Sequence, residues 1–260
     1  MMKVDLHNHT ALCNHADGTM EEYVQQAIAK KIDVFGFSDH APMRFDEEWR
    51  MKFEEIPFYE KSVLELQQKY HQDIQILLAY EVDFLAGYLD EHILQRPVDY
   101  FIGSVHFLGT WGFDNPEFIG EYQHHDINEI WQHYFEAIEA LAKSRLFDIV
   151  GHIDLMKVFN YLPTKDIRIL AKPAIQAIKK SGMCVELNAA GFRKPIQEQY
   201  PSPPIMELLA EHDIPITFGS DAHSIEHIGF QQETLSTLAH TYGYTKCATF
   251  EQRDRRLVNF

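Results

Sequence analysis

Short apolar stretches, each followed by a longer segment with helical spacing of its apolar residues, recur along the chain. The stretches are rich in β-branched and aromatic side chains, as expected of strands buried on both faces. The predicted strands are Lys3–Leu6, Val34–Ser38, Ile74–Tyr80, Tyr100–Val105, Asp148–Gly151, Met183–Leu187 and Ile214–Gly219, with a weaker one at Cys247–Phe250. Strands that alternate with helices in this way predict a parallel sheet with helices packed against it.

The segments between these strands carry the features of helices. Thr19 and Glu22 have the spacing of a capping box, which predicts that a helix begins after Thr19. Apolar residues at three- and four-residue spacing predict further helices at Phe58–Tyr70 and Asp126–Ser144. Pro173 interrupts another helical segment, where we expect two helices or a kinked one, because proline has no amide hydrogen to donate.

The number of units favours a barrel. Seven strand–helix units in 260 residues match the size of a (β/α) barrel, with seven units favoured over eight. A doubly wound open sheet is the alternative, but His7, Asn8 and His9 follow the first strand where a Rossmann fold has its glycine-rich phosphate loop. No internal repeat, low-complexity tract or long linker interrupts the chain, so we expect one domain over residues 1–260.

Composition narrows the class of protein. Hydrophobic residues make up 45% and charged residues 24% of the chain, as in ordinary globular proteins. No stretch approaches the roughly 18 consecutive apolar residues of a membrane span, and the first residues do not have the form of a secretory signal. The three cysteines are odd in number and far apart, which is typical of the reducing cytoplasm. We therefore expect a cytoplasmic protein with no membrane association.

Charge argues against one class of partner and favours one class of cofactor. The chain has 39 acidic and 23 basic residues, a net charge of −16. Nucleic-acid-binding proteins gain much of their affinity from basic residues on phosphates, so we expect no nucleic acid partner. Fifteen histidines against three cysteines favour metal ligation by imidazole and carboxylate rather than by thiolate.

Metal-capable side chains stand at the carboxyl end of nearly every predicted strand, where barrel enzymes carry their chemistry. In chain order they are Asp5, His7, His9, Asp39, His40, Glu81, His106, His152, Asp154, Glu186, Asp221 and His223. Folding of a barrel does not by itself require such residues at these places. Their regular placement therefore predicts a metal centre.

The local spacings suit metal ligation. His7 and His9 are two residues apart, so both can point to one ion from the same face of a strand, and the same holds for Asp221 and His223. Glu81 has two carboxylate oxygens with which to bridge two ions. Imidazole and carboxylate ligands suit Zn, Mn or Fe. Two such ions roughly 3.5–4 Å apart would supply hydroxide at neutral pH and stabilise an in-line displacement.

Each histidine also has a simpler interpretation. Taken singly, His40, His106 or His152 would more often be a hydrogen-bonded core residue. Their joint placement at successive strand ends is what favours metal ligation. Cys13 lies among the ligand candidates and is predicted to be a bystander. Eight histidines on helical or loop stretches are predicted to be solvated or packed: His71, His92, His124, His125, His133, His212, His227 and His240. Four carboxylates are predicted to orient ligand imidazoles: Asp5, Asp17, Asp39 and Asp154.

Several motifs in order resemble those of the PHP (polymerase and histidinol phosphatase) superfamily. They are Asp5-Leu6-His7-Asn8-His9, Phe37-Ser38-Asp39-His40, Gly151-His152 and Gly219-Ser220-Asp221-Ala222-His223. Gly36 to Pro42 and Ile102 to His106 are similar to the monofunctional histidinol-phosphatase branch. The resemblance implies a distorted (β/α)7 barrel with up to three metals, and a PHP-type metal-dependent phosphatase domain over residues 1–260. It also implies hydrolysis of L-histidinol phosphate to L-histidinol and phosphate in histidine biosynthesis.

The resemblance further implies three ligand sets, carried over motif by motif. His7, His9, Glu81 and Asp221 would hold the first metal; Glu81, His106 and His152 the second; His15, His40 and His223 the third. Attack by a hydroxide that bridges the first two metals would make Glu81, His106 and Asp221 catalytic. Cys13 or Asp17 could replace His15 as a ligand of the third metal.

Three residues are predicted to bind the phosphomonoester substrate. Arg193, in the loop after the sixth strand, is the first choice for a forked clamp on the phosphate. Lys157 is the second choice, and Ser104 could add a hydrogen bond. Asp17, or a metal-bound water, is the candidate for protonating the leaving group.

Other functions remain open at this stage. One is a related phosphatase that acts on a sugar phosphate, a phosphotyrosine or a nucleotide, and another is a non-catalytic metal-binding module. A PHP exonuclease is disfavoured by the acidity of the chain. An amidohydrolase barrel is disfavoured because its metal-bridging lysine would be expected where this chain has Ser104-Val105-His106. The sequence leaves the native metal, the occupancy of the third site and the oligomeric state undetermined.

Overall fold

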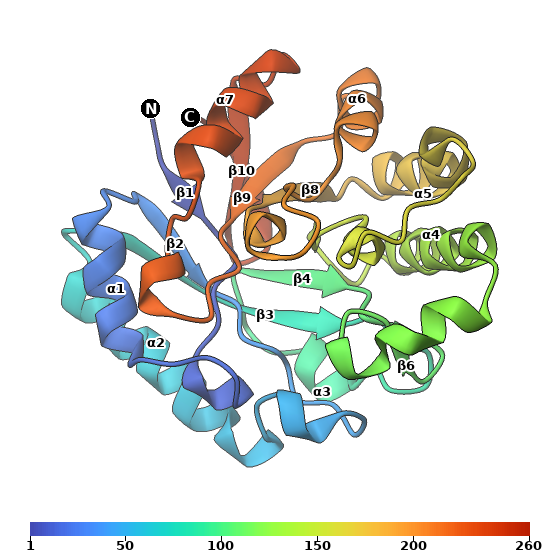
Figure 1. The fold of residues 1–260 in the computed structure, drawn as a ribbon. Coiled ribbons are helices and arrows are strands. Elements are labelled where there is room, and N and C mark those ends of the chain that lie inside the picture. The colour runs from blue at the N-terminus through green and yellow to red at the C-terminus, as the bar shows by residue number, and fades with distance from the viewer.

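Seven parallel strands form the centre of the computed structural model, which describes all of residues 1–260 (Figure 1). Neighbours in the sheet follow one another in the chain. The strands are β1 (Val4–Asp5), β2 (Val34–Phe37), β3 (Gln75–Asp83), β4 (Tyr100–Ser104), β7 (Ile149–Val150), β8 (Cys184–Asn188) and β9 (Ile216–Gly219). Each overlaps a strand predicted from the sequence, so the apolar pattern located the whole sheet.

Hydrogen bonds between the first and last strands bring the sheet to closure. The Leu6 amide donates to the Phe218 carbonyl at 2.9 Å, and the Asp221 amide donates to the His7 carbonyl at 2.7 Å. β1 and β7 have only two residues each, so the barrel is distorted. The expected (β/α)7 barrel is confirmed, and the doubly wound open sheet is wrong.

A tyrosine fills the interior of the barrel. The hydroxyl of Tyr100, from β4, donates to the carbonyl of Leu6 at 2.5 Å. It passes Gly36 of β2 so closely that a Cβ at Gly36 would lie 1.7 Å from the hydroxyl oxygen. Only glycine leaves room for this contact, which makes the interior a packed core rather than a channel.

Six helices surround the barrel (Figure 1). They are α1 (Met20–Ala29), α2 (Ile56–Tyr70), α4 (Ile127–Ser144), α5 (Ile167–Ser181), α6 (Pro203–Glu211) and α7 (Gln232–Thr241), while α3 (Glu91–Leu94) is a single turn. The capping box of Thr19 and Glu22 is present at the start of α1. Each helix turns an apolar face to the sheet; in α4, for example, Trp131, Tyr134 and Ile138 are fully buried.

Pro173 lies inside α5, which the structure forms as one helix. Of the two alternatives expected there, a division into two helices is therefore wrong. Proline removes one backbone hydrogen bond. Leu170 and Ala171 before it and Ala174 and Ile175 after it are nevertheless buried in the same core, and this packing keeps the helix continuous.

A C-terminal hairpin covers the amino end of the barrel. β10 (Lys246–Glu251) pairs antiparallel with β11 (Asp254–Asn259). Phe250 packs against Tyr100 with ring centroids 5.5 Å apart. Arg253 donates to Asp148, which immediately precedes β7, at 2.9 Å. Part of β10 was predicted; β11 was not, because its residues are polar and exposed.

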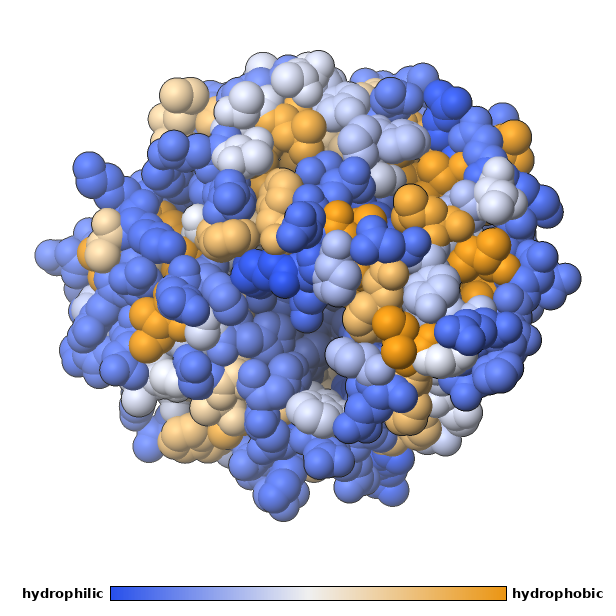
Figure 2. Space-filling model, viewed as in Figure 1, coloured by the Kyte–Doolittle hydropathy of each residue, from blue (hydrophilic) through white to orange (hydrophobic).

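Long connections gather at the opposite, carboxyl end of the strands. Their short elements are η1 (Ala11–Cys13), η2 (Glu47–Trp49), η3 (Phe53–Glu55), β5 (Phe107–Leu108), β6 (Trp111–Gly112), η4 (Pro116–His124), η5 (Leu155–Lys157), η6 (Ala190–Arg193) and η7 (Ile225–His227). Together they surround a hollow at the centre of this face (Figure 2). None of the helices combines the length and apolar composition needed to cross a membrane.

Candidate metal centre

The hollow is a cavity of about 590 Å³. Figure 2 shows hydrophilic residues at its centre. Seven of the nine predicted ligands line it: His15, His40, Glu81, His106, His152, Asp221 and His223. The other two, His7 and His9, are fully buried and contact Glu81 and Asp221. The structure therefore brings all nine predicted ligands together.

The predicted first set converges around one point. His7 Nε2 lies 3.4 Å from Glu81 Oε2, and His9 Nε2 lies 3.7 Å from the same oxygen. Asp221 Oδ1 lies 3.2 Å from His9 Nε2 and 4.0 Å from His7 Nε2. His7 and His9 follow β1, Glu81 belongs to β3 and Asp221 follows β9, so three separate parts of the chain meet here.

The predicted second set uses the other oxygen of Glu81. His152 Nε2 lies 2.9 Å from Glu81 Oε1, and His106 Nε2 lies 3.7 Å from it. The two histidine nitrogens are 3.2 Å apart. In a tetrahedral zinc site with Zn–N bonds of about 2.0–2.1 Å, two ligand nitrogens lie about 3.3 Å apart. The geometry matches that of two ligands on one ion, with Glu81 placed to bridge two sites.

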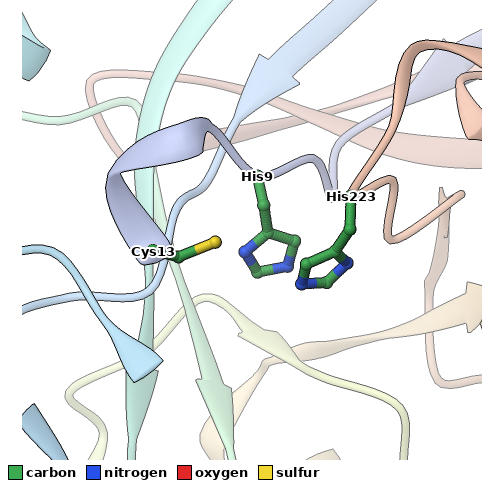
Figure 3. Close-up of side chains that lie close together, drawn as sticks. All are labelled: His9, Cys13 and His223. Carbon is green, nitrogen blue, oxygen red and sulfur yellow. The ribbon is translucent and has the colours of Figure 1, made fainter. Parts of the chain in front are cut away.

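The predicted third set, His15, His40 and His223, also forms a cluster in which one ligand atom of each lies within 4.8 Å of the others. Cys13 belongs to a second possible grouping, with His9 and His223. Figure 3 shows the Cys13 sulfur directed toward the rings of His9 and His223. However, the Cys13 thiol donates to the Thr10 carbonyl at 3.1 Å, and burial raises its pKa. Both observations favour the predicted role of a bystander.

Unsatisfied polar atoms at the centre provide a test of whether metal ions fit these residues. His7 Nε2 and His9 Nε2 are buried and have no hydrogen-bond partner, and the buried atoms His40 Nδ1 and Glu81 Oε2 lie 2.9 Å apart without hydrogen-bond geometry. Buried polar atoms are rarely left without partners, because the lost hydration is not replaced. All four face the same small space, so cations bound there would supply the missing interaction.

The protonation states of Glu81 and of two histidines of the predicted third set, His40 and His223, are compatible with bound metal ions. Burial raises the pKa of Glu81, but the charges of His7 and His106 hold it well below 4.5. Burial, followed by the charge of His9, lowers the pKa of His40 to about 3 and that of His223 well below 6.5. At neutral pH the centre therefore offers charged carboxylates and, at His40 and His223, neutral imidazoles. Burial lowers the pKa of His7, His9 and His106, but neighbouring carboxylates raise it above that of an ordinary histidine, so a metal ion that binds there would release their protons.

Carboxylates orient the ligand imidazoles. Glu186 Oε2 lies 2.8 Å from His7 Nδ1, and Asp83 Oδ1 lies 2.6 Å from His106 Nδ1. Asp39 Oδ1 is 3.4 Å from His9 Nδ1, which forms no hydrogen bond, so the predicted role of Asp39 stays a prediction. Such partners select the tautomer and ring orientation of a metal-binding histidine.

Two of these partners were missed, and two predicted ones act elsewhere. Asp83 could have been found, because it stands two residues after Glu81 on the same face of β3. Glu186 was noted at its strand end without a role. Asp5 instead accepts from the Ser220 amide, and Asp154 accepts from the Ser202 amide, so both hold loops rather than ligand histidines.

Arg193 reaches the cavity wall, as the prediction of a phosphate contact requires. Its Nη2 donates to the carbonyls of Ser220 and Asp221 at 2.9 and 2.8 Å, which fixes the guanidinium. Its Nη1 is buried without a partner. The hydroxyl of Tyr200, also on the cavity wall, is likewise buried without a partner. Tyr200 was not predicted, since nothing in its local sequence sets it apart from a core tyrosine.

The structure does not bring three other predicted residues to the cavity wall. The Lys157 ammonium is buried and donates to Glu198 at 2.5 Å and to the Gln199 carbonyl at 2.7 Å. Ser104 is buried and donates to Glu81 Oε1 at 2.6 Å, so it supports the predicted ligand rather than a substrate. Asp17 is exposed outside the cavity lining. Asp114, by contrast, does line the cavity, and burial raises its pKa.

Comparison with known proteins gives consistent matches. The family model described as "PHP domain" matches residues 5–190. A protein of Deinococcus radiodurans named "Probable histidinol-phosphatase" is 40% identical over 232 residues, which cover 87% of this chain and 88% of that protein. The histidinol-phosphatase of Bacillus subtilis is 28% identical over 267 residues, covering 90% and 98%.

A solved structure matches the fold over nearly the whole chain. It is the histidinol phosphate phosphatase of Lactococcus lactis, complexed with zinc, L-histidinol and phosphate. The two chains superpose with a TM-score of 0.80 at 21% identity, over 98% of each. The overall fold is therefore shared over nearly the whole of both chains.

Proposed function

The chain belongs to the PHP domain family, and from this premise we propose that it is a histidinol-phosphatase. The reaction is the hydrolysis of L-histidinol phosphate to L-histidinol and phosphate, a step of histidine biosynthesis. The observation that carries the proposal is the convergence of histidines and carboxylates from separate strand ends on one cavity. The names of the Deinococcus and Bacillus relatives, and the ligands of the Lactococcus structure, support the choice of substrate.

The residues fit two to three divalent ions, of Zn, Mn or Fe. His7, His9, Glu81 and Asp221 would hold the first, Glu81, His106 and His152 the second, and His15, His40 and His223 the third. When bound, such ions lower the pKa of coordinated water toward about 7 and neutralise phosphate oxygens. Glu81, His106 and Asp221 are catalytic in this scheme because they hold the groups that touch the reacting phosphate.

The chain's own donors would orient the phosphate. The Nη1 group of Arg193 and the hydroxyl of Tyr200 are free to donate on the same cavity. A guanidinium that is already fixed by two carbonyl acceptors loses little entropy when it binds a phosphate oxygen. Asp114 replaces Asp17 as the proposed proton donor to the leaving oxygen, since it lines the cavity and burial raises its pKa.

The walls also suit the rest of the substrate. The carboxylate of Asp46 would attract the cationic amine of histidinol phosphate. Trp49 and Phe118 give the cavity two aromatic faces against which an imidazole could pack. Charge and shape together therefore favour a small phosphomonoester that carries an amine over a nucleic acid.

Release of phosphate from histidinol phosphate tests the proposal. We expect metal-loaded protein to turn it over, chelator-stripped protein to be inactive, and added Zn, Mn or Fe to restore activity. An aryl phosphate and a sugar phosphate, assayed in parallel, test the choice of substrate. Full activity after thorough stripping would refute the metal-dependent reaction. Metal binding without hydrolysis of any ester would identify a binding module instead.

A further inference from the structure

Three charged side chains form a row that ends at the predicted second metal site. Arg50 Nη2 donates to Asp46 Oδ2 at 3.1 Å, and Arg50 Nη1 donates to Asp83 Oδ2 at 2.9 Å. The second oxygen of Asp83, Oδ1, lies 2.6 Å from Nδ1 of the ligand His106. Arg50 and Asp83 are each 3% exposed, so the two members of the row nearest His106 are buried, while Asp46 is partly exposed.

The row determines which nitrogen of His106 is available to a metal. His106 directs Nε2 toward Glu81 Oε1 and His152 Nε2. A lone pair on Nε2 requires the proton of the neutral ring to be on Nδ1. Asp83 accepts that proton's hydrogen bond, and as a carboxylate it can only accept. The arrangement therefore selects the tautomer that can bind a metal.

Arg50 holds Asp83 in place and ties a loop to the centre. Both oxygens of Asp83 are used, one by each partner, so the carboxylate cannot rotate away from His106. Arg50 belongs to the loop between β2 and α2, and its Nε donates to the Asp46 carbonyl at 2.9 Å. Asp46, Trp49 and Arg50 from this loop line the cavity. One guanidinium thus fixes both a metal ligand and part of the cavity wall.

We propose that Asp83 and Arg50 are positioning residues that hold His106 in its metal-binding tautomer. The inference rests on the proposed function, since it assigns a role toward the second metal ion of that site. Its consequence is selective: loss of the row weakens the ion at His106 and His152, and leaves the outer site at His15 and His223 intact.

Asp83→Asn is the first test. The single amide oxygen would be held by Arg50, so the amide NH2 would face His106 Nδ1 and move the ring proton to Nε2. We expect the affinity for one metal ion to fall about 10- to 100-fold, with kcat falling and KM nearly unchanged. Ions retained per chain after dialysis against graded chelator, together with steady-state kinetics, measure both effects. In the zinc-loaded wild type, nitrogen-15 NMR should identify a hydrogen-bonded proton on His106 Nδ1.

Variants of Arg50 are the second test, and the control is an ion pair outside the cavity. Arg50→Met should reproduce the loss, and Arg50→Lys should restore it only in part, because an ammonium cannot contact both Asp46 and Asp83 in a fork. The control is Glu60→Gln, which breaks the pair of Glu60 with Arg96 outside the cavity. It should change stability without changing metal retention.

The outcomes separate the two proposals. Wild-type protein that retains no metal, or does not hydrolyse histidinol phosphate, would overturn the proposed function. An active wild type with an Asp83→Asn variant that keeps every ion and its kcat would overturn the positioning role alone. A rise in KM alone in Arg50→Met would identify Arg50 as a substrate contact and overturn its positioning role.

Discussion

His7 donates a hydrogen bond to Glu186 at 2.8 Å. The two side chains can meet because Gly219, which lies beside them, has no side chain of its own. Gly219 belongs to β9, which lies between β8 with Glu186 and β1, which precedes His7. A Cβ at Gly219 would lie 2.7 Å from Glu186 Oε2 and 2.7 Å from the Cβ of His7. Real Cβ atoms do not approach that closely, so one of the partners would have to move.

Gly219→Ala should therefore impair metal binding without unfolding the protein. Displacing Glu186 from His7 removes the partner that orients this ligand, and such losses cost about 10- to 100-fold in metal affinity or activity. Metal content and kcat/KM measure the effect. Gly120→Ala is the control, because nothing lies within 4 Å of a Cβ placed there. Equal activity of the two variants would contradict the role assigned to Glu186.

Arg193→Ala should weaken substrate handling while the metals stay bound. A hydrogen bond to a charged group contributes about 1.5–3 kcal/mol, so we expect kcat/KM to fall about 10- to 100-fold, mainly through KM. Arg193→Lys should not restore it, because the guanidinium must contact two carbonyls and a phosphate at once. Arg168→Ala, on the exposed face of α5, is the control. Loss of metal in Arg193→Ala would show that the arginine supports the centre instead.

Stability of the metal-free protein should decrease as pH rises above neutral. Burial lowers the pKa of His106, but Asp83 and Glu81 raise it to about 10, against 6.5 for an ordinary histidine. A raised folded-state pKa means that the stabilising contribution is complete below pH 6.5 and is lost as pH rises toward 10. Urea unfolding in chelator across that interval measures it. Asp83→Asn should flatten the dependence, and an equal slope in that variant would exclude His106 as the cause.

Phe250→Ala should affect stability but not the reaction. The side chain is 2% exposed and packs on Tyr100 at the amino end of the barrel. Its loss should reduce the free energy of unfolding by about 3–5 kcal/mol. Leu257→Ala in the same hairpin should change it by less than about 0.5 kcal/mol, because Leu257 is largely exposed. At a temperature where both variants are folded, kcat should equal that of the wild type; a large fall in Phe250→Ala would link the hairpin to the site.

The sequence located the strands and the metal-capable residues because both depend on local patterns. A buried parallel strand must be apolar on both faces, and residues that follow its carboxyl end are few, so His7, Glu81 and Asp221 could be identified by position. The resemblance supplied the grouping of these residues into sets. Asp83 and Glu186 escaped assignment because a carboxylate that orients a histidine looks the same in sequence as one on the surface.

The misassigned substrate residues failed for a different reason. Lys157 and Ser104 stand close to predicted ligands in the chain, but the direction of a side chain depends on loop conformation. Lys157 turns to Glu198, 41 residues away, and Ser104 turns to Glu81. These contacts between distant residues have no local pattern. Strand β11 was not predicted for a related reason. Its residues have no strand pattern of their own, and it is a strand because it pairs with β10.

The C-terminal hairpin has a consequence for the order of events in a catalytic cycle. Phe250 and Tyr100 pack together at the amino end of the barrel, whereas the residues that line the cavity belong to the strand ends and loops of the opposite, carboxyl face. We therefore expect histidinol and phosphate to leave at the same face of the barrel at which the next substrate arrives. Phosphate that has not left the cavity occupies the place of the next substrate, so we expect it to inhibit the reaction competitively.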